Sequence, residues 1–459
     1  MNRKTLRSAG MPVFAVLSCI LSLPLLSFSQ SETILHRFRG GPGDGFFPNA
    51  QLIADKAGNL YGTTSQGGAN ELGAVFRLQP LTNGTWKEMV LHSFSGGSLG
   101  IAINEENLAI DAKGDIYGTT VFYGAHGSGS VFKLSRTSTG SWNYTVLHDF
   151  YFDGITNFDG DYPLAGLIVD RQGNLYGTTL LGGTGLCVQG NADTAPPKGQ
   201  GYTGCGTVFE LSPQEDGSWR ETLLYNFEGS TDGGWPAANL TLDRSGNLYG
   251  TAAGGGTNYS LCPGVYVSGC GLVFELQKAG TSWNESVLYT FSGDVDGGAP
   301  YGSVIIDRAG NLYGSTGGWQ QLGGSVYELS PSSAGSWTET TLVSWVDETA
   351  GFGAVGNLQL DDVGNLFGTT QFGSEPAPAQ APATLRGDGA IPKPFGPGTI
   401  FELSPNSDGT WSTTWLHTFG SGTDGVGPAA GLIRVGGVYY GTTYSDNGAG
   451  YGTVFKLVP

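Results

Sequence analysis

One heptapeptide recurs seven times along the chain, and this repetition constrains the fold more than any other feature. Its first copy is Gly58-Asn59-Leu60-Tyr61-Gly62-Thr63-Thr64. The central aromatic residues of the later copies, spaced 54 to 73 residues apart, are Tyr117, Tyr176, Tyr249, Tyr313, Phe367 and Tyr440. Self-similarity at such a period is typical of repeat architectures, in which each repeat is one supersecondary unit. We therefore expect seven copies of one unit.

Each unit contains four runs with the character of β-strands. An apolar run such as 304–306 leads through an Asp-x-x-Gly turn into the heptapeptide, where Asp accepts backbone hydrogen bonds and Gly tolerates positive φ. A third run such as 207–211 and a hairpin at Asp216-Gly217 precede a partly alternating fourth run that begins at Trp219. We find no sustained helical periodicity outside the N-terminal segment. Four antiparallel strands in each of seven units predict an all-β, seven-bladed β-propeller.

The two ends of the repeat region indicate how the ring closes. The region begins with a lone fourth-type run, 32–38, and finishes with a third-type run, 453–457. If the N-terminal strand completes the last blade, backbone hydrogen bonds join the ends and two exposed edges disappear. A linear solenoid is the alternative, but it would need capping units that the sequence does not show. We expect a single propeller domain over residues 30–459.

The N-terminal segment, residues 1–29, is predicted to be a signal peptide. Arg3, Lys4 and Arg7 precede an apolar stretch, and Ser27-Phe28-Ser29 offers small residues for cleavage before Gln30. The alternatives are an uncleaved membrane anchor and lipidation at Cys19. We expect a secreted or otherwise extracytoplasmic protein, in the periplasm, at the cell surface or in the medium, without membrane insertion after cleavage.

Four cysteines remain after this cleavage, and an even number in an exported chain indicates disulfides. They form two local pairs in long loops, so we predict the bridges Cys187–Cys205 and Cys262–Cys270. A site with four thiolate ligands is the rival interpretation. It would require two loops to converge, and no C-x2-C spacing supports it.

The charge balance excludes one class of partner. The formal net charge of −18 would become −21 on loss of Arg3, Lys4 and Arg7. Such an acidic body repels phosphate backbones and anionic bilayers, so we expect no nucleic-acid binding. Acidity also keeps a glycine-rich β-surface soluble. We expect the chain to be a monomer.

The recurring Asp-x-x-Gly-Asn-Leu-Tyr-Gly-Thr-Thr, followed by Gly-Thr-Val-Phe-Glu-Leu, resembles the GloVer tandem repeat of bacterial "choice-of-anchor" surface proteins. The resemblance covers essentially the whole mature chain. It implies export and a repeat architecture, without a settled biochemical activity. This sequence departs from the pattern in its seventh copy, where Gly436-Gly437-Val438-Tyr439 lacks the aspartate, and it ends on a repeat strand where many members carry an anchor domain.

The candidate ligand-binding residues lie in the loops from each outer strand to the next inner strand. In a propeller these loops share one face with the loops between second and third strands, and both sets vary here. Five loops carry Asp-Gly before a proline, and the candidates are Asp44, Asp159, Asp161, Asp232, Trp235, Asp296 and Asp424. Acids and neighbouring aromatic residues suit polar sugars or protein partners. In the structural alternative, Asp-Gly and Pro merely build the turn.

Calcium is a minor alternative for one of these loops, and no other cofactor is expected. Asn157-Phe158-Asp159-Gly160-Asp161 offers oxygen ligands at alternate positions, as an EF-hand loop does. The sixth position is Tyr162 and the twelfth is Ile168, where an EF-hand requires Gly and Glu. An irregular calcium loop stays open.

No catalytic constellation stands out in the sequence. His-Glu-x-x-His, Gly-x-Ser-x-Gly and P-loop patterns are absent, and four of the five histidines repeat one outer-strand position that suggests packing. We therefore expect a non-catalytic exported binding module with a glycan or protein ligand on the variable loop face. The alternatives are a polysaccharide-active propeller enzyme (a glycoside hydrolase, lyase or lactonase) and a purely structural cell-envelope protein.

Overall fold

The computed structural model describes residues 31–96, 108–122, 124–154, 158–187, 203–256, 262, 269–317, 324–333, 335–345, 352–372, 397–421, 424–428, 430–446 and 450–458. The expected signal peptide lies outside these ranges. Within them the chain forms strands, turns and loops without a helix, so no described helix is long and apolar enough to span a membrane.

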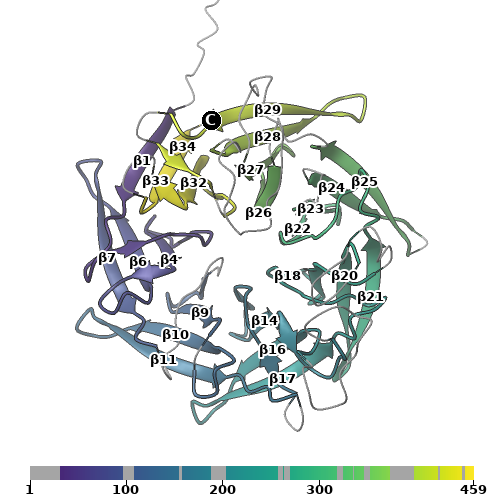
Figure 1. The fold of residues 1–459 in the computed structure, drawn as a ribbon, viewed down its shortest axis with the longest axis horizontal. Helices are drawn as coiled ribbons and strands as arrows, with labels where there is room; N and C mark the ends of the chain where they lie inside the picture. The colour runs from purple at the N-terminus through teal and green to yellow at the C-terminus, as the bar shows by residue number, and fades with distance from the viewer. Residues whose placement is uncertain are drawn as a thin grey trace, which may run out of the picture.

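Seven antiparallel four-stranded sheets stand around a central axis (Figure 1). This confirms the predicted seven-bladed β-propeller. The strands of each blade are given from inner to outer. Blade 1 consists of β3 (Ile53–Ala54), β4 (Leu60–Thr64), β6 (Ala74–Pro80) and β7 (Trp86–Ser93), and blade 2 of β8 (Ala109–Ile110), β9 (Ile116–Thr120), β10 (Ser130–Arg136) and β11 (Trp142–Asp149). Blade 3 consists of β13 (Ile168–Val169), β14 (Leu175–Thr179), β16 (Thr207–Pro213) and β17 (Trp219–Asn226). Blade 4 consists of β18 (Thr241–Leu242), β19 (Leu248–Ala252), β20 (Leu272–Ala279) and β21 (Ser282–Thr290), and blade 5 of β22 (Ile305–Ile306), β23 (Leu312–Thr316), β24 (Ser325–Pro331) and β25 (Trp337–Ser344). Blade 6 consists of β26 (Phe352–Leu360), β27 (Leu366–Phe372), β28 (Thr399–Pro405) and β29 (Trp411–Thr418).

Blade 7 is built from both ends of the chain. Its inner strands are β31 (Ile433–Val435), β32 (Val438–Thr443) and β34 (Thr453–Val458), and its outer strand is β1 (Ser31–Arg37). The antiparallel pairing of β1 with β34 runs from Ser31 opposite Val458 to Arg37 opposite Thr453. The predicted closure by the N-terminal strand is confirmed, and Figure 1 shows purple β1 beside yellow β34.

Connections in an antiparallel blade alternate between its two ends, so the ring has two distinct faces. We call them the loop face, with the outer-to-inner loops and the loops between second and third strands, and the turn face, with the Asp-x-x-Gly turns and the outer hairpins. On the loop face the two kinds of loop pair with each other in three small sheets. These are β2 (Gly45–Phe46) with β5 (Gln66–Gly67), β12 (Gly160–Asp161) with β15 (Leu181–Gly182), and β30 (Gly425–Val426) with β33 (Ser445–Asp446).

The heptapeptide is explained by contacts on both sides of its tyrosine. In the turn before β4, Asp55 accepts hydrogen bonds from the backbone N–H groups of Ala57 and Asn59, and Gly58 has φ +79°. Within β4, a Cβ on Gly62 would lie 2.7 Å from the Phe76 ring and 2.9 Å from Leu52. The same close approach recurs at Gly118, Gly177, Gly250, Gly314, Gly368 and Gly441. Only glycine leaves room for this packing.

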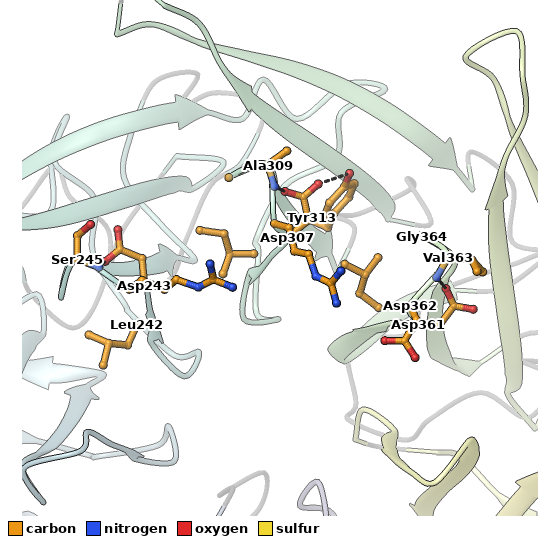
Figure 2. A pocket seen from close by; sticks show the side chains of 15 residues that line it. Leu242, Asp243, Ser245, Asp307, Ala309, Tyr313, Asp361, Asp362, Val363 and Gly364 are labelled. Atoms are coloured by element: carbon orange, nitrogen blue, oxygen red, sulfur yellow. Dashed lines mark hydrogen bonds between the residues drawn. The ribbon is translucent and has the colours of Figure 1, made fainter.

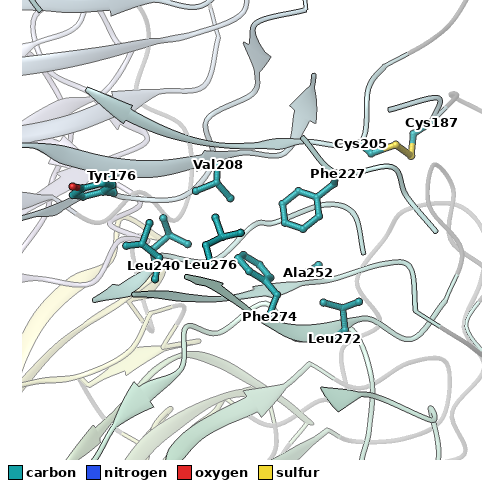
Figure 3. Packing of buried hydrophobic residues seen from close by; sticks show 11 residues of the cluster. Tyr176, Cys187, Cys205, Val208, Phe227, Leu240, Ala252, Leu272, Phe274 and Leu276 are labelled. Carbon is teal, nitrogen blue, oxygen red and sulfur yellow. A yellow bond between two sulfur atoms is a disulfide. The ribbon is translucent and has the colours of Figure 1, made fainter. Parts of the chain in front are cut away.

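The hydrophobic core is divided among the seven spaces between neighbouring blades. Figure 3 shows one of them, where Val208 and Phe227 of blade 3 meet Leu240, Phe274 and Leu276 of blade 4. At every interface an aromatic residue that ends one outer strand meets one in the third strand of the next blade, with ring centroids 5.0 to 5.6 Å apart. The pairs are Phe38–Phe76, Phe94–Phe132, Phe150–Phe209, Phe227–Phe274, Phe291–Tyr327, Trp345–Phe401 and Phe419–Phe455. Edge-to-face pairs of this kind add about 0.5–1.5 kcal/mol each beyond area burial.

Both predicted disulfides are present. Cys187–Cys205 and Cys262–Cys270 have S–S distances of 2.13 and 2.05 Å. Cys205 is fully buried and belongs to the core between blades 3 and 4 (Figure 3), while Cys262 and Cys270 join the next core along the ring. The bridges therefore tie loop-face excursions to the packed interior, and they are compatible with an extracytoplasmic protein.

Candidate functional site

The five Asp-Gly aspartates lie at separate blade interfaces on the loop face. Each accepts a hydrogen bond from the histidine or tyrosine near the end of the preceding outer strand. The contacts are Asp44 with His36 at 3.3 Å, Asp159 with His148 at 3.1 Å, Asp232 with the Tyr225 hydroxyl at 3.1 Å, Asp296 with the Tyr289 hydroxyl at 2.9 Å, and Asp424 with His417 at 3.2 Å. Backbone N–H groups of the same loops donate to Asp44, Asp159, Asp232 and Asp296 as well. The structure thus gives each carboxylate partners within its own blade.

A β-bulge lies in the outer strand of every blade, and in five of them it precedes the histidine or tyrosine that makes this contact. The register between third and outer strands shifts just before the histidine or tyrosine, for example between Val131 and Phe132, which leaves Leu147 unpaired before His148. An inserted residue resets which face of the sheet the next side chain occupies. Sequence reasoning assigned the repeated histidines to packing. Three of them also contact an aspartate, and the Leu-His-x-Phe spacing was the signal for a bulge.

Asp161 and Trp235 occupy different positions in these loops. Asp161 lies on β12 opposite Leu181, and burial raises its pKa to about 6 although hydrogen bonds from Ser128 and the Tyr162 backbone lower it. Trp235 is half-buried and packs against the core between blades 3 and 4. Asn157, part of the calcium alternative, lies outside the described residues.

Three aromatic residues on the loop face share an unusual backbone conformation. Phe47, Tyr162 and Trp235 have φ of 59°, 57° and 60°, and each directly precedes the proline of its Asp-Gly loop. Ala299 and Gly427 hold the same position, with φ of 51° and 65°. A positive φ costs a bulky residue of order 1–3 kcal/mol, whereas glycine adopts it without strain. Three blades therefore carry an aromatic side chain where glycine would be the unstrained choice.

These aromatic side chains are held by the backbone and by neighbouring rings. The N–H group of Trp235 donates to the Cys205 carbonyl, and its own carbonyl accepts from Ala253, so the residue links two blades. Phe47 is stacked on Tyr444 with centroids 4.5 Å apart and planes 5° from parallel, and Tyr162 meets Phe122 edge-on at 4.6 Å. The loop face thus presents partly exposed aromatic groups on a rigid frame.

The turn face carries an open cavity of about 920 Å³ that sequence reasoning did not find, because three separate turns form it. Figure 2 shows the turns of blades 4, 5 and 6 around it, with Asp243, Asp307 and Asp361 at matching positions. Asp307 accepts hydrogen bonds from the Ala309 N–H group and the Tyr313 hydroxyl. The side chains of Arg244 and Arg308 are exposed at this cavity, and Asp362 is paired with Arg434 at 3.2 Å.

A third set of residues, also missed from the sequence, consists of glutamates on the outer strands. Glu221 of blade 3 faces Asp159 and His148 of blade 2, and one ligand-type atom of each of the three lies within 4.8 Å of the others. In the described part of the chain this is the only such group of three or more His, Cys, Asp and Glu residues. The Asp-Gly carboxylates of different blades therefore do not converge on a common centre.

Comparison with known proteins identifies the repeat. The sequence pattern described as the Gloeobacter/Verrucomicrobia repeat matches residues 25–191 and 198–455, which is most of the chain. The chain belongs to this repeat family. No curated protein matches this Gloeobacter/Verrucomicrobia repeat protein in sequence.

Solved structures resemble this repeat protein only in their general fold. A protein of unknown function from Dyadobacter fermentans shares 13% identity at a TM-score of 0.42, covering 93% of this chain and 96% of that one. A gluconolactonase from Xanthomonas campestris shares 16% identity at 0.37, covering 74% and 86%. A luciferin-regenerating enzyme shares 13% identity at 0.39, covering 80% and 93%.

Proposed function

We propose that this protein is an exported, non-catalytic binding module that holds a saccharide on the loop face of its propeller. The observation that carries the proposal is the set of aromatic residues Phe47, Tyr162 and Trp235 kept at positive φ. Strain of this kind persists where surrounding structure enforces it, and it concentrates at ligand-binding positions. Aromatic faces on a rigid frame suit the apolar faces of sugar rings.

The surrounding loops supply the polar part of such a site. Asp161 is partly exposed on β12, and Tyr301 is 39% exposed at the end of the Asp296-Gly297 loop. The two disulfides join cysteines of the second-to-third loops to the packed cores beside the same face. A frame with little freedom to lose on binding favours affinity.

The turn-face cavity supports a second candidate site. Arg244 and Arg308 on its rim present guanidinium forks that pair with carboxylates. A ligand there would carry acidic groups, because the neighbouring turn aspartates already accept hydrogen bonds from their own turns.

An array of neutral and acidic oligosaccharides, followed by calorimetric titration of the best binder, tests the proposal. Trp235→Ala and Phe47→Ala should each weaken binding at least tenfold, which corresponds to about 1.4 kcal/mol. The double variant Arg244→Ala/Arg308→Ala is the matched control on the opposite face and should leave that affinity unchanged. Melting curves would confirm that every variant is folded.

The other outcomes separate the alternatives. Loss of binding only in the arginine variant would move the site to the turn face. Release of reducing ends from the bound saccharide would favour the polysaccharide-active enzyme. No binding across the array would remove the saccharide proposal.

A further inference from the structure

Five of the seven blade interfaces contain the same three-residue group, which we call the interface trio. It consists of a histidine or tyrosine on one outer strand, the aspartate of the following Asp-Gly loop, and a glutamate on the outer strand of the next blade. The trios are His36–Asp44–Glu88, His148–Asp159–Glu221, Tyr225–Asp232–Glu285, Tyr289–Asp296–Glu339 and His417–Asp424–Glu32.

The glutamates hold one fixed position in their strands. Each lies opposite the leucine of its own third strand, as Glu88 does opposite Leu78 and Glu285 opposite Leu276. This places the carboxyl group against the aspartate of the preceding blade. Carboxyl oxygens of Asp159 and Glu221 lie within 4.8 Å of each other, and at the other four interfaces the charge of the aspartate acts on the glutamate.

These glutamates are short of hydrogen-bond partners. One carboxyl oxygen, Oε1, is buried without a partner in Glu32, Glu88, Glu221 and Glu285, and only in Glu339 does Oε1 accept a hydrogen bond, from Thr341. A buried ionised oxygen without a donor is unfavourable. Burial first, and then the adjacent aspartate, raises the pKa of Glu32, Glu88, Glu221 and Glu285 to about 7. Arg37 opposes the rise at Glu32, and His148 opposes it at Glu221.

The two remaining interfaces provide an internal comparison. The loops after β7 and β25 have no Asp-Gly, and the glutamate position is then Tyr144 or Thr413. Tyr144 stacks on His92, with centroids 4.1 Å apart and planes 9° from parallel. The glutamate is thus present at the five interfaces that have the Asp-Gly aspartate and absent from the two that lack it. This joint occurrence indicates that the two carboxyl groups form one structural unit.

The histidine or tyrosine of the trio has the same role at all five interfaces, that of a hydrogen-bond donor to the aspartate. Tyrosine replaces histidine in two trios, and its hydroxyl donates to the aspartate at 3.1 and 2.9 Å. A neutral tyrosine is a hydrogen-bond donor and a poor ligand for divalent cations, so the common role is donation. The aspartate is thus the acceptor at each interface, and its charge acts on the neighbouring glutamate.

We propose that at these interfaces the glutamate is held as the neutral acid against the aspartate of the preceding blade, which makes closure of the ring dependent on pH. The groups that face the glutamates are His36 and Asp44, His148 and Asp159, Tyr225 and Asp232, Tyr289 and Asp296, and His417, Asp424 and Arg37. The inference does not rest on the proposed saccharide site.

The direction of the pH dependence follows from linkage. A glutamate that binds its proton more tightly in the folded state gives the folded protein more bound protons than the unfolded chain. Its contribution is complete below the unfolded value of 4.5 and is lost as the pH rises through about 7. The folded ring is expected to be most stable against unfolding under mildly acidic conditions.

The test compares melting midpoints of the mature protein between pH 5.0 and 8.5, in EDTA and in calcium. The wild-type midpoint should fall by roughly 5 °C or more across this range. Glutamine mimics the neutral acid, so the midpoint of Glu285→Gln should match the wild type at pH 5 and fall less by pH 8.5. The midpoint of the quadruple variant at Glu32, Glu88, Glu221 and Glu285 should fall less still, with a residual slope from Glu339, Asp161 and His148. Glu215→Gln, on the exposed hairpin before β17, is the matched control and should follow the wild type.

Infrared spectroscopy supplies a second measurement if the quadruple variant does not fold. The wild type at pH 5.5 should show the carbonyl band of protonated carboxylic acids, and Glu285→Gln should lose part of it. A flat wild-type profile, or a Glu285→Gln midpoint lowered equally at both ends of the range, would overturn the proposal. A midpoint raised by calcium and lowered by EDTA would overturn it too, because a cation and not a proton would then join the carboxyl pair.

Discussion

At the scale of single residues, the repeat uses its carboxylates as hydrogen-bond acceptors. Asp55 accepts from two backbone N–H groups, from the Asn59 amide at 2.7 Å and from the Tyr61 hydroxyl at 3.0 Å. Burial alone would raise its pKa, but these hydrogen bonds lower it below the usual value. The Asp-x-x-Gly turn was predictable because the hydrogen bonds to the aspartate and the positive φ of the glycine are both local features of the turn. The tyrosine contact was not, since it requires the strand after the turn to fold back.

Replacement of Asp55 by asparagine should therefore destabilise the protein by about 1.5–3 kcal/mol, the usual worth of hydrogen bonds to a charged group. The amide nitrogen of the new side chain would face the donors of Asn59 and Tyr61. Urea denaturation at pH 7 measures the loss. Because the folded pKa of Asp55 is lowered, its contribution is present above 3.8 and disappears as the pH falls through the folded value. The two proteins should converge in acid, and a constant difference would contradict this account.

At the scale of strands and loops, sequence periodicity predicted the four-strand unit and its order. It did not predict the positive φ of Trp235, because nothing local distinguishes that position from an ordinary residue before proline. The interface trios were missed for a different reason. Asp159 and Glu221 meet only after two blades pack side by side. The joint occurrence of Asp-Gly, His or Tyr, and Glu among the repeats was the available signal.

The disulfide loops allow a prediction at this scale. Cys187–Cys205 closes a loop with a sequence separation of 18, and the chain-entropy estimate for such a loop is about 3 kcal/mol. The double variant Cys187→Ser/Cys205→Ser should lose roughly that much stability in urea denaturation, with a further loss because Cys205 lies in the core. Cys262→Ser/Cys270→Ser, with a separation of 8, should lose less. Equal stability of the wild type and the first variant would show that the loop is already ordered without its bridge.

Strand β1 gives the second prediction at this scale. Deletion of residues 31–40 removes the outer strand of blade 7 and the Phe38–Phe76 pair at the closing interface. The truncated protein should melt well below the mature protein. A synthetic peptide of residues 31–40 should restore the midpoint in proportion to its concentration, because binding to the folded state stabilises it. A peptide with Phe38 replaced by alanine is the control and should restore the melting midpoint less. If the truncated and mature proteins melted at the same temperature, β1 would not close the ring.

At the scale of the whole molecule, every blade depends on both neighbours, since the core lies between blades and not within them. Phe274 belongs to blade 4, yet its ring contacts Phe227 of blade 3 with centroids 5.1 Å apart. Seven such contacts in a closed ring leave no terminal blade with a free face. A linear array of repeats unfolds progressively from its ends, whereas a closed ring has no end from which to begin.

Closure therefore predicts one cooperative unfolding transition for the entire ring. Phe274→Ala should destabilise it by about 3–5 kcal/mol, because the cavity forms in a fully packed interface. Far-ultraviolet circular dichroism and tryptophan fluorescence should shift together, since tryptophans such as Trp86, Trp219 and Trp337 lie in different blades and report on them at once. The exposed substitution Leu81→Ala, in the hairpin after β6, serves as a control with little expected effect. If the two probes separated in the Phe274 variant, blade 4 would be unfolding independently, and the strand pairing of β1 with β34 would not be enough to couple the blades.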